Sequence, residues 1–305
     1  MEKMKIVLIG GLGYIGKRFI QEFSKKYELF IYANKNSVSN TSKDFLEGIT
    51  VIEGSVEEEE NISHFIKEIN PKIVLHLAAM TGLKKCQENP EKTFGVNVNG
   101  TFNVIKSCIE TNSKLVFASS FEVYGKTSKD EREEEDILYP VNIYSLTKML
   151  GEELIKHAHK IHKLDYTILR ISNVYGPEYK RGINGMIKSA IAEKKIYIND
   201  RKRFKNFIYI DDVVELLNMV ISNNNSSNQI FNVGSKDTLN LEKIAKKIST
   251  YLNSNIEFEF LPGNKLETDY KPSLKKLNSF GYIAKTSFDE GLANTIEWHI
   301  NNCES

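Results

Sequence analysis

The stretch Met4-Lys5-Ile6-Val7-Leu8-Ile9-Gly10-Gly11-Leu12-Gly13-Tyr14-Ile15-Gly16 decides the fold of this chain. Its apolar run predicts a strand, its glycines predict a tight turn, and the amphipathic segment that follows predicts a helix. Gly10 lets the chain reverse, Gly13 lets backbone N–H groups approach a pyrophosphate, and Gly16 lets the helix pack close to the strand. Because a helix N-terminus attracts anions, the stretch predicts a dinucleotide-binding site.

Short apolar runs alternate with amphipathic segments through the first half of the chain. Strands are expected at residues 6–9, 29–32, 50–53, 73–77, 115–118 and 166–170, and helices at about 14–26, 60–69, 91–111 and 142–163. Each helix is long enough to return the chain to the same side of a sheet. The alternation therefore predicts an α/β fold with a doubly wound parallel sheet of the Rossmann type.

The alternation weakens after Arg170, where residues 207–210 and 230–233 are expected to return to the sheet. We predict a dinucleotide-binding domain at residues 1–175, with returns at about 205–235. A smaller C-terminal substrate lobe is expected to contain residues 176–204 and 236–305. The acidic run at residues 129–136 is expected to be a solvated loop.

The composition favours a small-molecule substrate. There are 41 basic and 40 acidic residues, so the net charge of +1 gives no reason to expect nucleic acid or a membrane as a partner. No apolar run approaches the roughly 20 residues of a membrane span. Three cysteines without metal-like spacing predict free thiols and a cytoplasmic location. His157, His159 and His162 do not share a helical face, so no metal is expected.

Two further segments indicate proton-transfer chemistry, namely Ser120-Phe121-Glu122-Val123-Tyr124-Gly125 and Tyr144-Ser145-Leu146-Thr147-Lys148. Tyr144 and Lys148 are four residues apart on a predicted helix, so they share one face. An ammonium there, together with an oxidised nicotinamide, is expected to lower the pKa of the phenol from its usual value of about 10. Tyr144 would then accept a hydroxyl proton while Ser120 hydrogen-bonds the substrate oxygen.

These segments resemble the extended short-chain dehydrogenase/reductase family, in particular the NAD-dependent epimerase/dehydratase group that modifies nucleotide sugars. The resemblance spans nearly the whole chain and includes residues 10–16, 76–79, 97–101, 170–177 and 207–213. It implies that Ser120, Tyr144 and Lys148 are catalytic and that Lys148 binds the nicotinamide ribose. It also implies a homodimer formed through the helices at 91–111 and 142–163. The expected cofactor-binding residues are Gly10, Gly13, Tyr14, Ile15, Gly16, Asn34, Lys35, Ser55, Val56, Leu77, Ala78, Ala79, Asn97, Tyr144 and Lys148.

The identity of the nicotinamide cofactor stays open. NAD-selective members carry a carboxylate at the end of the second strand, whereas this chain has Tyr32-Ala33-Asn34-Lys35. Lys35 could bind a 2′-phosphate or be an ordinary loop lysine, so the cofactor is NAD or NADP. Ser55 stands where the family commonly has an aspartate near the adenine, and its hydroxyl can still form a hydrogen bond.

The substrate-binding set is expected to be Ser120, Phe121, Glu122, Asn173 and Lys205. Lys205 replaces the arginine with which many members bind a diphosphate, and lysine lacks the bidentate fork of arginine. A cluster that also contains Arg201 and Arg203 could compensate.

Glu122 bears on the reaction type. Family dehydratases pair a glutamate at this position with a preceding aspartate, but this chain has Phe121 there. An epimerase or ketoreductase is therefore expected. The alternatives are a dehydratase or decarboxylase that uses Glu122, a structural role for Glu122, and a non-catalytic cofactor-binding protein.

Overall fold

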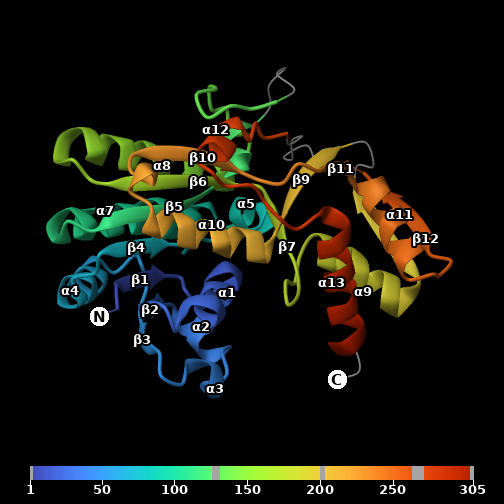
Figure 1. Cartoon of the computed structure of the whole chain (residues 1–305), viewed down its shortest axis with the longest axis horizontal. Coiled ribbons are helices and arrows are strands. Elements are labelled where there is room, and N and C mark those ends of the chain that lie inside the picture. Colours follow the sequence, from blue (N-terminus) through green and yellow to red (C-terminus); the bar gives the residue numbers. More distant parts are fainter. Residues whose placement is uncertain (1–2, 126–130, 200–202, 263–270, 303–305) are drawn as a thin grey trace.

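The core of the protein is a seven-stranded sheet in the order β10-β6-β5-β4-β1-β2-β3, in which every neighbouring pair is parallel (Figure 1). The computed structural model describes residues 3–125, 131–199, 203–262 and 271–302. The strands are β1 Lys5–Ile9, β2 Glu28–Ala33, β3 Thr50–Glu53, β4 Ile73–His76, β5 Lys114–Ser120, β6 Tyr166–Ile171 and β10 Gln229–Val233. The doubly wound parallel sheet predicted from the sequence is confirmed.

Helices cover both faces of this sheet, because successive side chains of a strand point to opposite faces. Ile6 and Leu8 pack on one face with α1 Tyr14–Phe23 and α10 Ile210–Ser222. On the other face, Val7 and Ile9 pack with α4 Glu59–Ile69, α7 Gly100–Thr111 and α8 Ile143–His162. A strand whose two faces are both buried has a continuous apolar sequence, as Ile6 to Ile9 of β1 have.

Shorter helices connect these elements. They are α2 Lys35–Ser39, α3 Lys43–Leu46, α5 Leu83–Glu88, α6 Pro90–Phe94, the π-helix η1 Gly95–Asn99, and the 3₁₀ helices η2 Phe121–Tyr124 and η3 Asn224–Ser226. The helix expected at residues 91–111 is therefore α6, η1 and α7 in direct succession.

Two small sheets form the second part of the molecule, on the right of Figure 1. One contains β7 Asn173–Tyr175, β9 Phe204–Tyr209 and β11 Thr238–Asn240, and the other pairs β8 Lys195–Asn199 with β12 Glu257–Leu261. The accompanying helices are α9 Ile183–Glu193, α11 Leu241–Tyr251 and α13 Phe288–Asn302, whereas α12 Lys275–Ser279 lies beside β10 at the edge of the central sheet (Figure 1). Ile187, Ile196, Ile244 and Ile296 extend the core of the α1 face into this region.

The expected return of residues 207–210 to the central sheet is wrong. β9 pairs instead with β7 and β11, and Ile210 begins α10. The edge beside β6 is taken by β10, whose Val233 lies opposite Ile171 and accepts a hydrogen bond from the N–H of Ser172 (2.8 Å). The return of residues 230–233 is confirmed.

The prediction of a solvated loop at residues 129–136 is also wrong for the part that the structure describes. Arg132 and Glu134 are buried, and Glu134 Oε1 accepts a hydrogen bond from the backbone N–H of Asn232 (2.8 Å). The Nδ2 of Asn232 donates to the carbonyl oxygen of Arg132 (2.9 Å). This segment is therefore fixed against the edge of the sheet.

Cys86 and Cys108 are buried free thiols, as predicted, and Cys303 lies outside the described residues. Within the described ranges, none of the helices has both the length and the apolar character needed to cross a membrane.

Candidate active site

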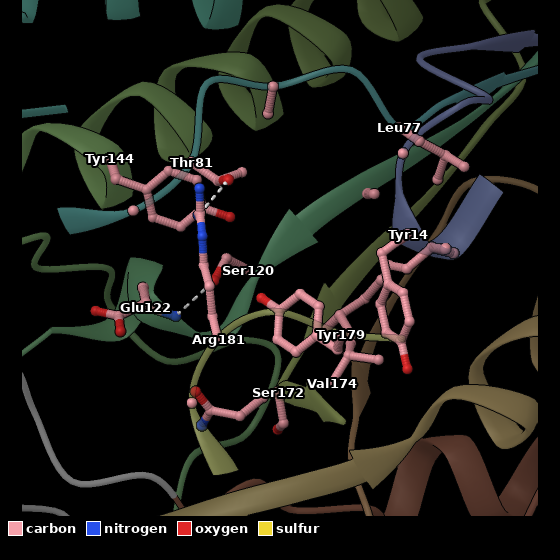
Figure 2. Close-up of a pocket in the computed structure, with 18 of the residues that line it drawn as sticks. Tyr14, Leu77, Thr81, Ser120, Glu122, Tyr144, Ser172, Val174, Tyr179 and Arg181 are labelled. Atoms are coloured by element: carbon pink, nitrogen blue, oxygen red, sulfur yellow. Dashed lines mark hydrogen bonds between the residues drawn. The ribbon is translucent and has the colours of Figure 1, made fainter. Parts of the chain in front are cut away.

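A cavity of about 460 Å³ lies at the carboxyl ends of β1, β4, β5 and β6 (Figure 2). The strand order reverses between β1 and β4, and ligands of open parallel sheets bind at such switch points. The cavity walls include these predicted residues: Gly10, Gly13, Tyr14, Ile15, Gly16, Leu77, Ala79, Ser120, Glu122, Tyr144, Lys148 and Asn173. The structure thus brings together five segments that are far apart in the sequence.

The glycine turn has the shape that a dinucleotide phosphate requires. Gly10 has φ of +77°, and a Cβ at this position would lie 2.6 Å from the Cα of Ala78. At Gly16 a Cβ would lie 2.2 Å from the carbonyl oxygen of Gly11. Gly13 precedes the first turn of α1, whose N–H groups have no acceptor within the helix. These residues fit a nicotinamide dinucleotide, with its phosphates on the N-terminus of α1.

Four predicted cofactor residues lie beyond the cavity wall, at the ends of β2 and β3. Asn34 caps α2 by accepting a hydrogen bond from the N–H of Ser37 (2.9 Å), and Lys35 is exposed at the first position of α2. Ser55 Oγ donates to Glu57 Oε2 (3.1 Å), and Val56 is buried. Their contact with the adenosine half of a dinucleotide stays a prediction.

Asn97 and Ala78 shape the site from behind its wall. The side chain of Asn97 is buried, accepts a hydrogen bond from the N–H of Met80 (2.7 Å) and donates to Thr147 Oγ1 (3.0 Å). It therefore fixes the loop after β4 to the helix that carries Tyr144. Ala78 packs against Gly10 in the glycine turn.

Tyr144 and Lys148 reach the cavity from the first two turns of α8. The side chain of Asn142 caps this helix by accepting a hydrogen bond from the N–H of Ser145 (2.8 Å), which sets where the helix begins. The Tyr144 phenol and the Ser120 hydroxyl both line the cavity, and Ser120 is close enough to influence the pKa of the phenol. Lys148 Nζ donates to the carbonyl oxygen of Ala118 on β5 (2.7 Å).

Lys148 alone does not lower the pKa of Tyr144 as predicted, and the lowering expected from an oxidised nicotinamide stays a prediction. Burial raises the pKa of Tyr144 above 10, the neighbouring Ser120 hydroxyl opposes the change, and the Glu122 carboxylate adds to it. Burial also lowers the pKa of Lys148 from 10.5 to about 8. The geometry therefore favours neutral Tyr144, which can donate a proton.

Glu122 lines the cavity whereas Phe121 does not. Glu122 Oε2 accepts a hydrogen bond from Asn142 Nδ2 (3.3 Å), and the N–H of Glu122 donates to Ser120 Oγ (3.3 Å). Phe121 is 1% exposed and packs on the ring of Tyr124, at a centroid distance of 4.7 Å. The structure therefore does not bring Phe121 to the cavity in which substrate contact was expected.

A segment that no sequence motif predicted as part of the site crosses the cavity between Gly176 and Gly182. The ring of Tyr179 stacks on Tyr14 of the glycine turn (4.6 Å between centroids), and Arg181 Nη1 donates to Thr81 Oγ1 (3.0 Å; Figure 2). Among the described residues, no carboxylate forms an ion pair with Arg181. The only signal in the sequence was an arginine shortly after the motif at residues 170–177.

A second cavity of about 490 Å³ adjoins the first and shares Asn173, Gly182, Ile183 and Phe207 with it. Lys205 lines this second cavity, together with Glu193 and Tyr197. Lys205 therefore lies apart from the Ser120 and Tyr144 wall. Arg203 does not line either cavity, and Arg201 lies outside the described residues.

Comparison with known proteins agrees with this architecture. The family model described as "NAD dependent epimerase/dehydratase family" matches residues 6–234, from β1 to the end of β10. A UDP-N-acetyl-alpha-D-glucosaminuronate decarboxylase of Bacillus cytotoxicus is 27% identical over 97% of this chain and 98% of its own. A dTDP-D-glucose 4,6-dehydratase of Dictyostelium discoideum is 24% identical over 98% of this chain and 82% of its own.

A solved structure of the UDP-glucose 4-epimerase of Thermus thermophilus, in complex with NAD, has the same fold. Its TM-score is 0.88 at 22% identity, over 98% of this chain and 100% of that chain.

Proposed function

Because this chain belongs to the NAD-dependent epimerase/dehydratase family, we propose that it is an epimerase or ketoreductase that acts on a secondary alcohol or ketone of a nucleotide sugar. One observation carries the proposal. Ser120, Tyr144 and Lys148 meet in one cavity beside the glycine turn, at the switch point of the sheet. A protein that only bound the cofactor would have no need of a hydroxyl and a phenol aligned on one substrate oxygen.

The side chains divide the work at the reacting oxygen of the sugar. Neutral Tyr144 donates a proton to a ketone oxygen as it becomes a hydroxyl, and Ser120 holds that oxygen by a second hydrogen bond. In the reverse direction the same phenol takes the hydroxyl proton. A nicotinamide on the glycine turn supplies the hydride chemistry that no side chain can perform. The second cavity, with Lys205 on its wall, has room for the nucleotide of the substrate.

Two measurements test this function. The first is mass spectrometry of the nucleotide that the freshly purified protein releases on denaturation. Stoichiometric NAD favours an epimerase, which returns the same hydride, whereas an empty site that binds NADPH tightly favours a ketoreductase.

The second measurement incubates the protein with a panel of nucleotide sugars and follows products by NMR. Cofactor binding without turnover across a broad panel would instead support a non-catalytic protein.

A nucleotide-uronate decarboxylase is the second candidate, and Glu122 and Arg181 favour it. Both line the cavity, and the guanidinium of Arg181 has donors suited to a carboxylate. The Bacillus cytotoxicus relative carries the name of such an enzyme. Dehydration is less favoured, because Phe121 stands where dehydratases carry an aspartate. Release of CO₂ from a nucleotide-linked uronic acid, and not from its neutral parent sugar, distinguishes this candidate from an epimerase.

We also propose that the protein is a cytoplasmic homodimer. Phe102 of α7 and Ile161 of α8 are 47% and 56% exposed, so each expected interface helix presents a large apolar side chain. The buried free thiols of Cys86 and Cys108 support a reducing compartment.

A further inference from the structure

One face of α8 holds the end of β5 at three places. Tyr144, Lys148 and Glu152 follow one another at intervals of four residues, so they lie on the same face of the helix. Tyr144 lies beside Ser120, and Lys148 Nζ donates to the carbonyl oxygen of Ala118 (2.7 Å). Glu152 completes the series, because its Oε1 accepts a hydrogen bond from Ser119 Oγ. Each of three consecutive residues of β5 therefore lies against one turn of the helix, and two of them are hydrogen-bonded to it.

Close packing of α8 on β5 makes these contacts possible. Gly151 faces the strand, and a Cβ at that position would lie 2.9 Å from the ring of Phe117. Lys148 Nζ lies 4.7 Å from the centroid of the same ring. The helix and strand are thus too close for a larger residue at Gly151.

Glu152 is anchored in turn by Arg170 of β6. Glu152 is 0% exposed and Arg170 is 2% exposed. Arg170 donates to both carboxylate oxygens, with Nη2 to Oε2 at 2.7 Å and Nε to Oε1 at 3.1 Å. Its Nη1 donates to the Tyr124 hydroxyl (2.6 Å) and to the carbonyl oxygen of Glu134 (2.8 Å). A carboxylate held by this many donors has little freedom to move.

Glu152 also balances the charge of Lys148. The ionisable groups facing Lys148 are Tyr144 and Glu152, each one turn away on α8, Cys86 on α5 and His76 on β4. Burial raises the pKa of Tyr144, so its phenol is neutral at neutral pH. Cys86 is buried and its thiol pKa is raised, while the pKa of His76 is lowered to about 3, so both are neutral at neutral pH. Glu152 is therefore the anion that favours the ammonium form of Lys148.

We propose that Glu152 is a positioning residue for the proposed reaction. Without contacting substrate, it holds Ser119 so that Ser120 stays in line with Tyr144, and it keeps Lys148 charged. Arg170 fixes Glu152 in that place. The inference rests on the proposed function for its catalytic consequence, and its effect on Lys148 is measurable without a substrate.

The test compares Glu152→Gln with Glu153→Gln, its exposed neighbour on the same helix. Competitive acylation of lysines across a pH series, with the Lys148 peptide quantified by mass spectrometry, gives the pH at which Lys148 loses its proton. In the wild type the midpoint is expected near 8. Glu152→Gln is expected to lower it by roughly one pH unit, because the neighbouring anion is gone. Glu153→Gln should leave it unchanged.

The second measurement is steady-state turnover of a substrate identified in the panel of nucleotide sugars. Glu152→Gln is expected to lower kcat by roughly tenfold or more, with KM changed less than about threefold, and to move the alkaline limb of the pH profile to lower pH. Ser119→Ala is expected to lower kcat while leaving the Lys148 midpoint in place. A protein that turns over no nucleotide sugar refutes the proposed function alone, because acylation still tests the effect on Lys148.

Arg170 without its partner could destabilise the fold, so Glu152→Gln/Arg170→Gln serves as a further variant. Removing both charges should restore thermal stability, yet the Lys148 midpoint should stay below that of the wild type. Recovery of the wild-type midpoint together with stability would mean that the pair only stabilises the fold. An unchanged midpoint in Glu152→Gln would overturn the inference as well.

Discussion

Burial favours the neutral forms of both Tyr144 and Lys148, although the two residues lie side by side on α8. Their spacing predicted the shared face correctly, because helical periodicity is a property of the sequence. The direction of the Tyr144 pKa could not be predicted in this way. Desolvation depends on everything that packs around a side chain, and here it raises the pKa of the buried phenol.

Tyr144→Phe is expected to lower turnover by roughly 10²–10⁴-fold, the range usual for loss of a general acid or base. Binding of the nicotinamide cofactor should stay within a few fold of the wild type, since the ring remains. Steady-state kinetics and calorimetric titration measure the two quantities. Tyr139→Phe, on a side chain that is 66% exposed, is the matched control. Full turnover by Tyr144→Phe would contradict the assigned role.

Lys148 predicts a specific dependence of stability on pH. Its pKa is lowered from 10.5 to about 8 in the folded protein, so between these values the unfolded chain binds more protons than the native one. The free energy of unfolding contributed by Lys148 therefore rises as pH increases from about 8 to 10.5. Denaturant titrations give the free energies of unfolding of the wild type and of Lys148→Met. If the variant is the more stable at pH 7, the difference between the two free energies should shrink as pH rises across this window. A constant difference would contradict the burial penalty.

At the scale of elements, the glycine turn and α1 form the part of the site that the sequence predicts best. Gly10 and Gly16 are required by close backbone contacts. A Cβ added at Gly13, in contrast, would contact only the carbonyl oxygen of Gly10, at a distance of 3.3 Å. A side chain at Gly13 would therefore enter the cavity without disturbing the fold.

Gly13→Val is thus expected to weaken dinucleotide binding by at least roughly tenfold, while the melting temperature changes by only about a few degrees. Titration calorimetry with NAD and with NADP, alongside thermal unfolding, measures both effects. Gly185→Val, at a helical glycine whose Cβ would meet open space, is the control. Undiminished dinucleotide binding by Gly13→Val would exclude the turn from the cofactor site.

The elements that sequence reasoning misplaced share one physical cause. Residues 204–209 have the composition of a strand, but strand propensity does not determine which strand they pair with. Because β10 occupies the edge beside β6, β9 pairs with β7 instead. Likewise, the charges of Arg132 and Glu134 suggested solvent, yet both residues are buried, and Asn232 of β10 donates to the Glu134 carboxylate and to the carbonyl oxygen of Arg132. Arg181 reaches the cavity because two glycines redirect the chain, which no periodic pattern reveals.

At the scale of the whole molecule, the proposed dimer makes a prediction about α7 and α8. Phe102→Glu or Ile161→Glu places a charge in the expected interface and should yield a monomer, because a buried unpaired charge is costly. Light scattering after size exclusion measures the mass. Ile300→Glu on α13, at a side chain that is 46% exposed, should leave the mass of the wild type unchanged. Equal masses for all variants would argue against this interface.

The position of β10 has a consequence for how the protein is made. The central sheet receives its last strand from residues 229–233, after the chain has left to build β7, α9, β8 and β9 and returned. Until those residues emerge from the ribosome, β6 presents an open edge that other chains can join. Closing this edge joins segments about 60 residues apart, a long-range contact of the kind that slows folding. We therefore expect residues 1–175 on their own to aggregate, since their sheet is complete only in the longer chain.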